Sequence, residues 1–189
     1  MRKVIVSEFV SLDGVMEDPG GAEKFEHGGW TMPYGNEEIG KFKFDELFAG
    51  GAFLLGRVTY QGFAAAWPSR TDEAGFADRM NSLPKYVVST TLQEVGWNNS
   101  RLIKGNVAEE VSKLKQEVGQ DILIAGSGLL VQTLMQHDLI DEYRLLVYPV
   151  VLGSGKRLFR DGGNTTLRLV EAKTFGSGVV LLRYEPDRK

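Results

Sequence analysis

Short apolar runs alternate with amphipathic segments along the first two thirds of this chain. The apolar runs are rich in β-branched or aromatic residues, and most end at turn-forming residues, as strands do. They lie at residues 4–10, 52–55, 86–89, 102–103 and 122–125. Runs of this kind are typical of strands in a parallel sheet that helices cover on both faces.

The segments between these runs carry the marks of helices. We expect helices at residues 37–49, 57–67, 73–80, 107–118 and 129–136. The fourth is marked most clearly, because Asn106 can cap its first turn, Glu109 completes a capping-box pattern and Gly119 ends it. The alternation of strand and helix predicts a mainly parallel sheet flanked by helices.

The last third of the chain changes pattern. Longer strands are expected at residues 143–151, 167–175 and 179–185, and a glycine-rich turn at residues 176–178 joins the last two as a hairpin. The sheet is therefore expected to be mixed. No repeat, linker or low-complexity segment interrupts residues 1–189, so we expect a single α/β domain.

The composition of the chain argues against several classes of function. The chain has no cysteine and only two histidines, so disulfides, thiolate nucleophiles and a metal site are not expected. Its net charge is −3 and no basic run stands out, which argues against a nucleic-acid partner. No apolar run approaches the length of a membrane span and no signal-like segment opens the chain, so we expect a cytoplasmic protein with no membrane partner.

Three expected strand ends carry residues that suit phosphate groups. The first is the Gly56-Arg57-Val58-Thr59 motif, the second is Ser89-Thr90, and the third is the turn Gly126-Ser127-Gly128. Helix N-termini offer unpaired N–H groups to anions, and glycine lets the backbone approach a ligand closely. Each motif alone is better explained as a simple capped loop, because short motifs often occur by chance. Three of them in one mixed α/β domain favour a ligand at the carboxyl edge of the sheet.

The same motifs carry a family resemblance. Residues 54–60 resemble the Gly-Arg-x-Thr motif of dihydrofolate reductases. The closer similarity is to the RibD C-terminal domain family, the reductase domain of riboflavin-biosynthesis enzymes, through Ser-Leu-Asp-Gly at residues 11–14 and a long block at residues 139–159. The resemblance covers nearly the whole chain in the same order. It implies a dihydrofolate-reductase-like three-layer α/β/α fold, with a mixed, mainly parallel sheet and a C-terminal antiparallel hairpin.

The resemblance also implies NADPH as the cofactor. Carried over by position, its binding residues are Gly56, Arg57, Thr59, Ser89, Thr90, Lys104, Gly126, Ser127, Gly128 and Leu129. Arg57 beside hydroxyl groups suits a phosphate better than a free 2′-hydroxyl, which favours NADPH over NADH. Related reductases carry a cis Gly-Gly bond at the glycine turn, so we expect a cis bond between Gly126 and Ser127.

For the substrate side, the resemblance implies an acid on the helix after the first loop. Glu38 lies four residues before Phe42-Lys43 and is the candidate proton donor, with Asp13 as a second catalytic candidate. Phe42 and Trp30 are the candidate substrate-binding side chains. Two alternatives stay open: Glu38 can simply stabilise a helix N-terminus, and Asp13 can simply shape the Asp-Gly turn.

Together these observations predict an NADPH-dependent reductase that transfers a hydride to a small heteroaromatic or pterin-like substrate. The alternative is an NADPH-, nucleotide- or flavin-binding protein of the same fold without turnover. A third class, an interaction protein that has lost the site, also stays open. The apolar late strands and the family resemblance further predict a homodimer.

Overall fold

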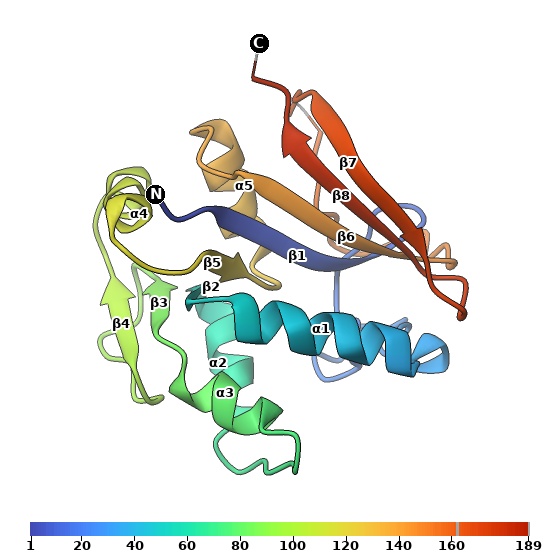
Figure 1. Ribbon diagram of the computed structural model, residues 1–189, viewed down its shortest axis with the longest axis horizontal. Coiled ribbons are helices and arrows are strands. Elements are labelled where there is room, and N and C mark those ends of the chain that lie inside the picture. Colours follow the sequence, from blue (N-terminus) through green and yellow to red (C-terminus); the bar gives the residue numbers. More distant parts are fainter. Residues whose placement is uncertain (162, 189) are drawn as a thin grey trace.

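One twisted sheet forms the centre of the computed structural model, which describes residues 1–161 and 163–188 (Figure 1). Its strands are β1 (Val4–Ser11), β2 (Ala52–Gly56), β3 (Lys85–Val88), β4 (Ser100–Ile103), β5 (Ile122–Ile124), β6 (Glu142–Tyr148), β7 (Leu167–Thr174) and β8 (Val180–Pro186). Their order is β4-β3-β2-β5-β1-β6-β8-β7. The first six are parallel, and β8 runs antiparallel to both β6 and β7. The mixed sheet and its C-terminal hairpin are thereby confirmed.

Helices cover both faces of this sheet (Figure 1). One layer contains α1 (Glu37–Ala49), α2 (Arg57–Ala66) and α3 (Phe76–Ser82), and the other contains α4 (Val107–Gln116) and α5 (Gly128–Gln136). Leu47 and Met80 of the first layer pack in one buried cluster with Phe53, whereas Val111 and Leu134 pack on the opposite face. The three-layer α/β/α fold expected from the sequence is confirmed. No helix in the described part of the chain is long and apolar enough to cross a membrane.

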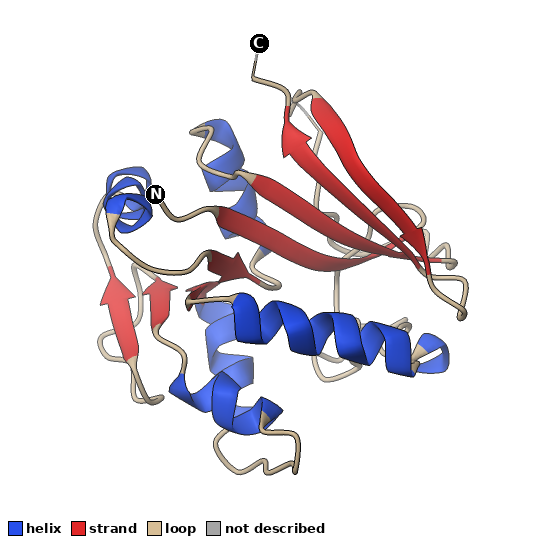
Figure 2. Cartoon of the chain, in the orientation of Figure 1, coloured by secondary structure: helices blue, strands red, loops and turns tan. Residues whose placement is uncertain are grey.

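Two long loops lie beside each other at one end of the sheet (Figure 2). One follows β1 and leads to the short 3-10 helix η1 (Met32–Tyr34), and the other connects β6 to β7. The N–H of Leu12 donates to the carbonyl of Val150 at 2.8 Å, and that of Met16 donates to Lys156 at 2.8 Å. β6 ends at Tyr148, earlier than expected, because the chain leaves the sheet at Pro149, which has no N–H to donate to a ladder.

The short strand β5 opens the sheet near its centre. β5 pairs with β1 only as far as Val6, opposite Ile124, and with β2 only at Ala52 and Phe53. Both neighbours continue past the end of β5, β1 to Ser11 and β2 to Gly56. The carboxyl ends of β1 and β2 are therefore separated by a gap, which is where ligands gather in open α/β sheets.

Candidate active site

A cleft of about 1140 Å³ opens where β5 ends. The carboxyl ends of β1, β2, β3 and β5 line it, together with the first residues of α2 and α5. The structure brings nine of the ten expected cofactor-binding residues to this cleft: Gly56, Arg57, Thr59, Ser89, Thr90, Gly126, Ser127, Gly128 and Leu129. Lys104 is not among the lining residues, and its ammonium instead donates to the amide oxygen of Gln93 at 3.1 Å.

The turn after β5 is held by hydrogen bonds to α2. The N–H of Ser127 donates to the hydroxyl of Thr59 at 3.0 Å, and the hydroxyl of Ser127 accepts from the N–H of Gly56 at 2.9 Å. A Cβ atom on Gly126 would lie 2.8 Å from the Thr59 hydroxyl oxygen, so only glycine fits there. These contacts fix the beginnings of α2 and α5 side by side at the cleft.

The expected cis bond between Gly126 and Ser127 is wrong. The bond is trans, and both residues adopt the left-handed region, each with φ of 62°. Two left-handed residues reverse the chain here without the roughly 2.5–4 kcal/mol that a cis bond before a non-proline residue costs.

α2 and α5 begin without side-chain caps, unlike the other α-helices of the described chain. Asn36 caps α1 and Asn106 caps α4, and the Asp72 carboxylate accepts from two N–H groups in the first turn of α3. No side chain caps α2 or α5, which both begin at the cleft. Their first N–H groups lack intrahelical partners and are therefore available to an anionic ligand.

A buried acid, Glu8 of β1, lies in the same cleft. Its side chain is 5% exposed, and its Oε2 accepts from the N–H of Gly126 at 2.9 Å. Its Oε1 has no hydrogen-bond partner within the described residues. Burial raises the pKa of Glu8 well above its ordinary value, while the Gly126 N–H and the Lys43 ammonium act in the opposite direction.

A second set of charged side chains, Lys43 and Glu46, extends from α1 to the cleft. The Lys43 ammonium donates to the Ser7 hydroxyl at 2.9 Å and to the Glu46 carboxylate, and Ser7 donates to Glu46 Oε2 at 2.8 Å. Arg144 of β6 donates to the other oxygen of Glu46 at 3.1 Å. Burial opposes ionisation of Glu46, but the adjacent Lys43 and Arg144 hold its pKa below the ordinary value. Glu46 is therefore an ionised, fully paired carboxylate.

The two expected catalytic residues do not line the cleft. Asp13 accepts from the Ser11 hydroxyl at 2.6 Å and from the N–H groups of Leu152 and Gly153, contacts that lower its pKa to about 2. Glu38 is exposed, and its Oε2 accepts from the N–H of Gly176 in the β7–β8 turn at 2.8 Å. Asp13 thus ties the two long loops together, and Glu38 ties α1 to the hairpin. Their catalytic roles stay predictions.

The expected substrate-binding aromatics pack elsewhere as well. Trp30 is buried against Tyr148, with ring centroids 5.4 Å apart, and Phe42 lies 6.3 Å from Phe175. Both belong to the apolar cluster between α1 and the hairpin. The apolar lining of the cleft includes instead Phe9, Leu47, Phe53, Phe63, Trp67, Phe76 and Met80.

Sequence reasoning did not identify Glu8, Lys43 or Glu46. One signal could have found the first: Ser7 and Glu8 interrupt β1 with two consecutive polar residues, although the strand is almost wholly buried. A polar pair inside a central strand requires partners, because a buried polar group without one is costly. Lys43 and Glu46 could then have been inferred as partners from the expected helix α1, because a helix places side chains three residues apart on one face.

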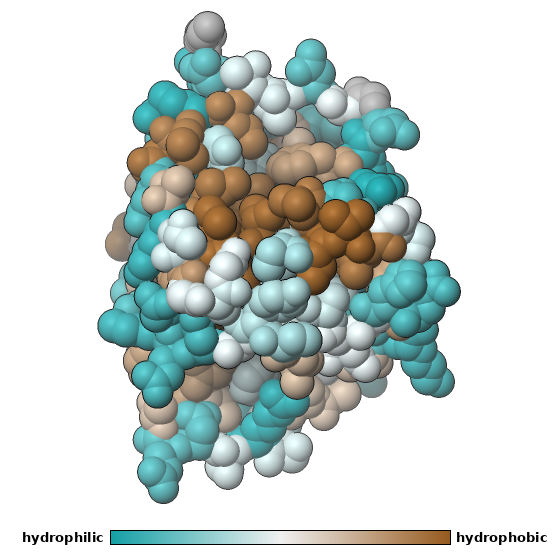
Figure 3. All heavy atoms as spheres, turned by 90° about the vertical axis from the view of Figure 1, so that its right-hand side faces the viewer, coloured by the Kyte–Doolittle hydropathy of each residue, from teal (hydrophilic) through white to brown (hydrophobic). Residues whose placement is uncertain are grey.

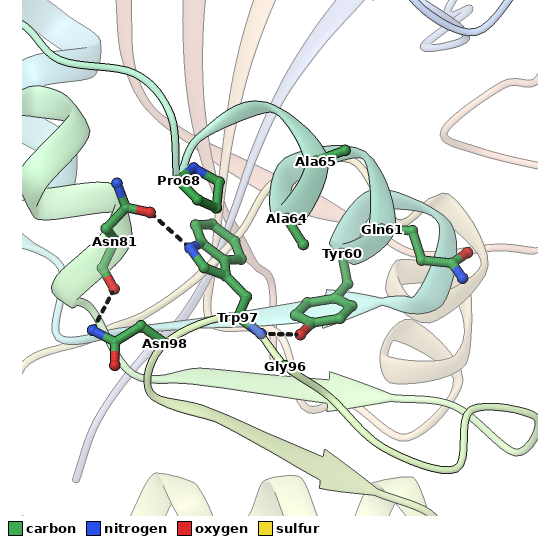
Figure 4. Close-up of a pocket in the computed structure, with 9 residues that line it drawn as sticks. All are labelled: Tyr60, Gln61, Ala64, Ala65, Pro68, Asn81, Gly96, Trp97 and Asn98. Atoms are coloured by element: carbon green, nitrogen blue, oxygen red, sulfur yellow. Dashed lines mark hydrogen bonds between the residues drawn. The ribbon is translucent and has the colours of Figure 1, made fainter.

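A second cavity, of about 710 Å³, lies between α2, α3 and the loop before β4 (Figure 4). The N–H of Trp97 donates to the hydroxyl of Tyr60 at 3.0 Å, and its indole N–H donates to the Asn81 side chain at 2.7 Å (Figure 4). These polar groups satisfy one another and join the loop to the two helices. The cavity therefore has a structural explanation, and the large cleft is the candidate active site.

We predict that Gly126→Ala destabilises the protein. The new Cβ would contact Thr59, and alanine is disfavoured at positive φ, so the free energy of unfolding should fall by at least about 1 kcal/mol. Gly40→Ala is the matched control, because a Cβ at Gly40 in α1 would meet nothing within 4 Å and should stabilise the helix by about 0.5–1 kcal/mol. Urea unfolding of both variants tests this, and equal stabilities would contradict it.

Comparison with known proteins places the chain in a family. The uncharacterized protein YyaP of Bacillus subtilis (strain 168) is 34% identical over 187 residues, covering 97% of this chain and 94% of YyaP. A Shewanella sp. PV-4 protein provisionally named for riboflavin biosynthesis has a similar structure, with TM-score 0.76, 24% identity and coverage of 98% and 99% of the two chains.

A second similar structure belongs to a longer protein. The Thermotoga maritima diaminohydroxyphosphoribosylaminopyrimidine deaminase/5-amino-6-(5-phosphoribosylamino)uracil reductase matches with TM-score 0.62 and 14% identity, over 98% of this chain and 56% of that one. These two structural matches support the fold. The family model of the RibD C-terminal domain matches residues 2–181. The chain therefore belongs to the RibD C-terminal domain family.

Proposed function

We propose that the cleft binds NADPH and that the protein is a reductase that transfers a hydride to a small heteroaromatic or pterin-like substrate. The observation that carries the proposal is the convergence of two uncapped helix N-termini on one cleft. Membership of the RibD C-terminal domain family supports a reductase-type activity, and the name of the Thermotoga maritima neighbour includes a reductase.

The residues of the cleft fit a dinucleotide with phosphate groups. The first N–H groups of α2 and α5 would hold phosphates. The Arg57 guanidinium donates to the neutral Gln61 at 3.1 Å, a contact that a phosphate could replace. Ser89 is buried and its hydroxyl already accepts from the N–H groups of Thr91 and Leu92, so it shapes the turn after β3. Thr90 is exposed beside it and offers a hydroxyl to a ligand.

The rest of the cleft suits a flat, partly polar substrate. Phe9, Phe53 and Trp67 provide apolar and aromatic walls, and Glu8 and Lys43 provide polar groups among them. A mostly apolar pocket with a few fixed polar groups is the usual form of a small-molecule site. When bound, NADPH would supply the hydride, and the side chains of the cleft would orient the substrate and limit its contact with water.

We predict that NADPH binds more tightly than NADH and that Arg57→Ala removes most of the difference. A charge-assisted contact to phosphate contributes on the order of 1.5–3 kcal/mol, roughly tenfold to more than a hundredfold in affinity. Titration of both cofactors against wild type, Arg57→Ala and Arg101→Ala measures this. Arg101 is an exposed cation on the edge strand β4, outside the cleft, and serves as the control. Equal affinities of the wild type for NADPH and NADH would contradict the prediction.

The alternative function is binding without turnover. It is an NADPH-, nucleotide- or flavin-binding protein that would use the same cleft, so NADPH binding by itself does not separate it from a reductase. A screen of pterins, pyrimidines and quinones for NADPH consumption does separate them. Consumption with one of these classes supports the reductase and identifies its substrate class.

We also propose a homodimer. β7 is an edge strand of the described sheet, with Leu169 50% and Val170 44% exposed. Figure 3 shows apolar side chains gathered on the end of the molecule where the β7–β8 turn lies, and the exposed apolar residues Leu12, Met32 and Val151 belong to the loops there. Exposed strand edges and contiguous apolar surface favour association.

The homodimer predicts a mass near twice 20.9 kDa in light scattering at micromolar concentration. Leu169→Lys should shift the population toward monomer, because it places a charge on the exposed edge strand. Val118→Lys, at a fully exposed position after α4, is the matched control and should leave the mass unchanged. A wild-type species of 20.9 kDa alone would count against the dimer.

A further inference from the structure

We infer that Glu8 is a catalytic residue of the cleft, a neutral carboxylic acid whose Oε1 donates a proton to a heteroatom of the substrate. This inference rests on the proposed function and adds to it the identity of the acid and the kind of bond that is reduced. It follows from where Glu8 lies, from how its two oxygens are bonded and from the charges around it.

The position of Glu8 is set by the unequal lengths of β1 and β5. Their pairing ends at Val6 and Ile124, so Glu8 is two residues beyond the last pair, beside the turn that follows β5. On its other side β1 continues to pair with β6, where Glu8 lies opposite Leu145. Glu8 is therefore held by a rigid central strand at the edge of the gap that forms the cleft.

The two carboxyl oxygens of Glu8 differ in their partners. Oε2 accepts from the N–H of Gly126 at 2.9 Å, and a backbone N–H can only donate, so Oε2 is the acceptor oxygen of the group. Oε1 is buried and has no partner within the described residues. Buried polar atoms are almost always hydrogen-bonded, so an exception beside a cleft requires an explanation, and a bound ligand would complete the bonding. The acid proton thus belongs on Oε1.

Burial, more than the surrounding charges, favours the protonated form of Glu8. The charged groups near it are Lys43 and Glu46 from α1, and Arg144 from β6, which pairs with Glu46. The Lys43 ammonium is already bonded to Glu46 and Ser7, so its charge mainly stabilises the carboxylate of Glu46 and not that of Glu8. Burial is the largest influence on the pKa of Glu8 and raises it well above the ordinary value. A positioned acid that stays protonated near neutral pH is suited to general acid catalysis.

The proposed step balances in atoms and charge. Bound NADPH would supply a hydride to an electrophilic carbon of the substrate, and the π electrons of its C=N or C=O bond would move to the heteroatom. The proton of Glu8 Oε1 would then form the new N–H or O–H bond on that heteroatom. The O–H bond electrons stay on Glu8 as a carboxylate, which the Gly126 N–H stabilises, and water in the open cleft returns the proton. This step requires a substrate with a C=N or C=O group. It therefore defines the substrate class more narrowly than the apolar character of the cleft does.

Other acids near the site are less suited to this step. Glu46 is ionised and bonded to Lys43, Ser7 and Arg144. Asp13 and Glu38 accept from backbone N–H groups outside the cleft lining. Glu17 lines the cleft but is paired with Lys156 at 2.7 Å, and that contact lowers its pKa. Glu8 alone among these acids combines burial, a place in the cleft and a free oxygen.

We predict that Glu8→Gln lowers kcat by roughly 10²–10⁴-fold while the Kd for NADPH stays within about twofold of wild type. Glutamine keeps the shape of the side chain and an oxygen to accept from Gly126, but it carries no acidic proton. The assay uses NADPH with a pterin, and Glu109→Gln, an exposed acid on α4, is the control. Glu38→Gln tests the acid that the sequence indicated. Wild-type kcat in Glu8→Gln, or a comparable loss in Glu38→Gln alone, overturns the inference.

A cofactor-free measurement tests the protonation itself. An infrared carbonyl band of a protonated carboxyl should be present in the wild type at pH 7, be missing from Glu8→Gln and shift when the pterin is added. Because Glu8 ionises in the unfolded chain but favours the protonated form in the fold, its contribution to wild-type stability should fall as the pH rises above the ordinary glutamate pKa. Glu8→Gln lacks this dependence, so its Tm relative to wild type should increase between pH 4 and pH 7.

The two sets of measurements separate the possible failures. NADPH binding without the infrared band, or with a Tm difference that does not change with pH, overturns the role of Glu8 and leaves the proposed cofactor intact. The infrared band without NADPH binding overturns the proposed function and, with it, the catalytic role of Glu8.

Discussion

The hydrogen bonds at the turn after β5 are the interactions on which the rest of the site depends. Two adjacent residues make these bonds. Gly126 is bonded to Glu8 of β1, and Ser127 is bonded to Thr59 and Gly56 at the start of α2. These bonds bring a central strand and the beginnings of two helices to one point. β5 is only three residues long, so the strands on either side part there and leave room for a ligand.

The distribution of charge in the cleft follows from the same placement of strands and helix N-termini. The beginnings of α2 and α5 carry the positive ends of two helix dipoles without side-chain caps, which favours an anionic ligand at that side. The side next to β1 and α1 contains a buried acid and a paired Lys43–Glu46 group. The cleft therefore has one half suited to an anionic ligand and one half that contains a buried acid, a division that fits the proposed nicotinamide-dependent reduction.

Most of the fold, and the placement of the Gly-Arg-x-Thr and Gly-Ser-Gly motifs at the cleft, could be predicted from the sequence, because both depend on local patterns. Strand runs, capping residues and the Gly-Arg-x-Thr and Gly-Ser-Gly motifs are short and lie next to the elements they define. The substrate half depends on side chains that are distant in sequence, such as Glu8 and Gly126, which are 118 positions apart. The position of Glu38 before Phe42-Lys43 indicated an acid, but the helix turns Glu38 toward the hairpin at Gly176. The left-handed turn at Gly126 and Ser127 likewise requires the three-dimensional contact with Thr59.

The most direct test of the central claim is a titration of the 15N-labelled protein with NADPH, followed by the amide signals in NMR spectra. The largest shifts should occur at the uncapped N-termini of α2 and α5, at Val58, Gly128 and Leu129. The capped beginning of α1, at Ile39, lies outside the cleft lining and should not move. Shifts concentrated at Ile39, or no shifts at millimolar NADPH, would contradict a cofactor site at the uncapped helices.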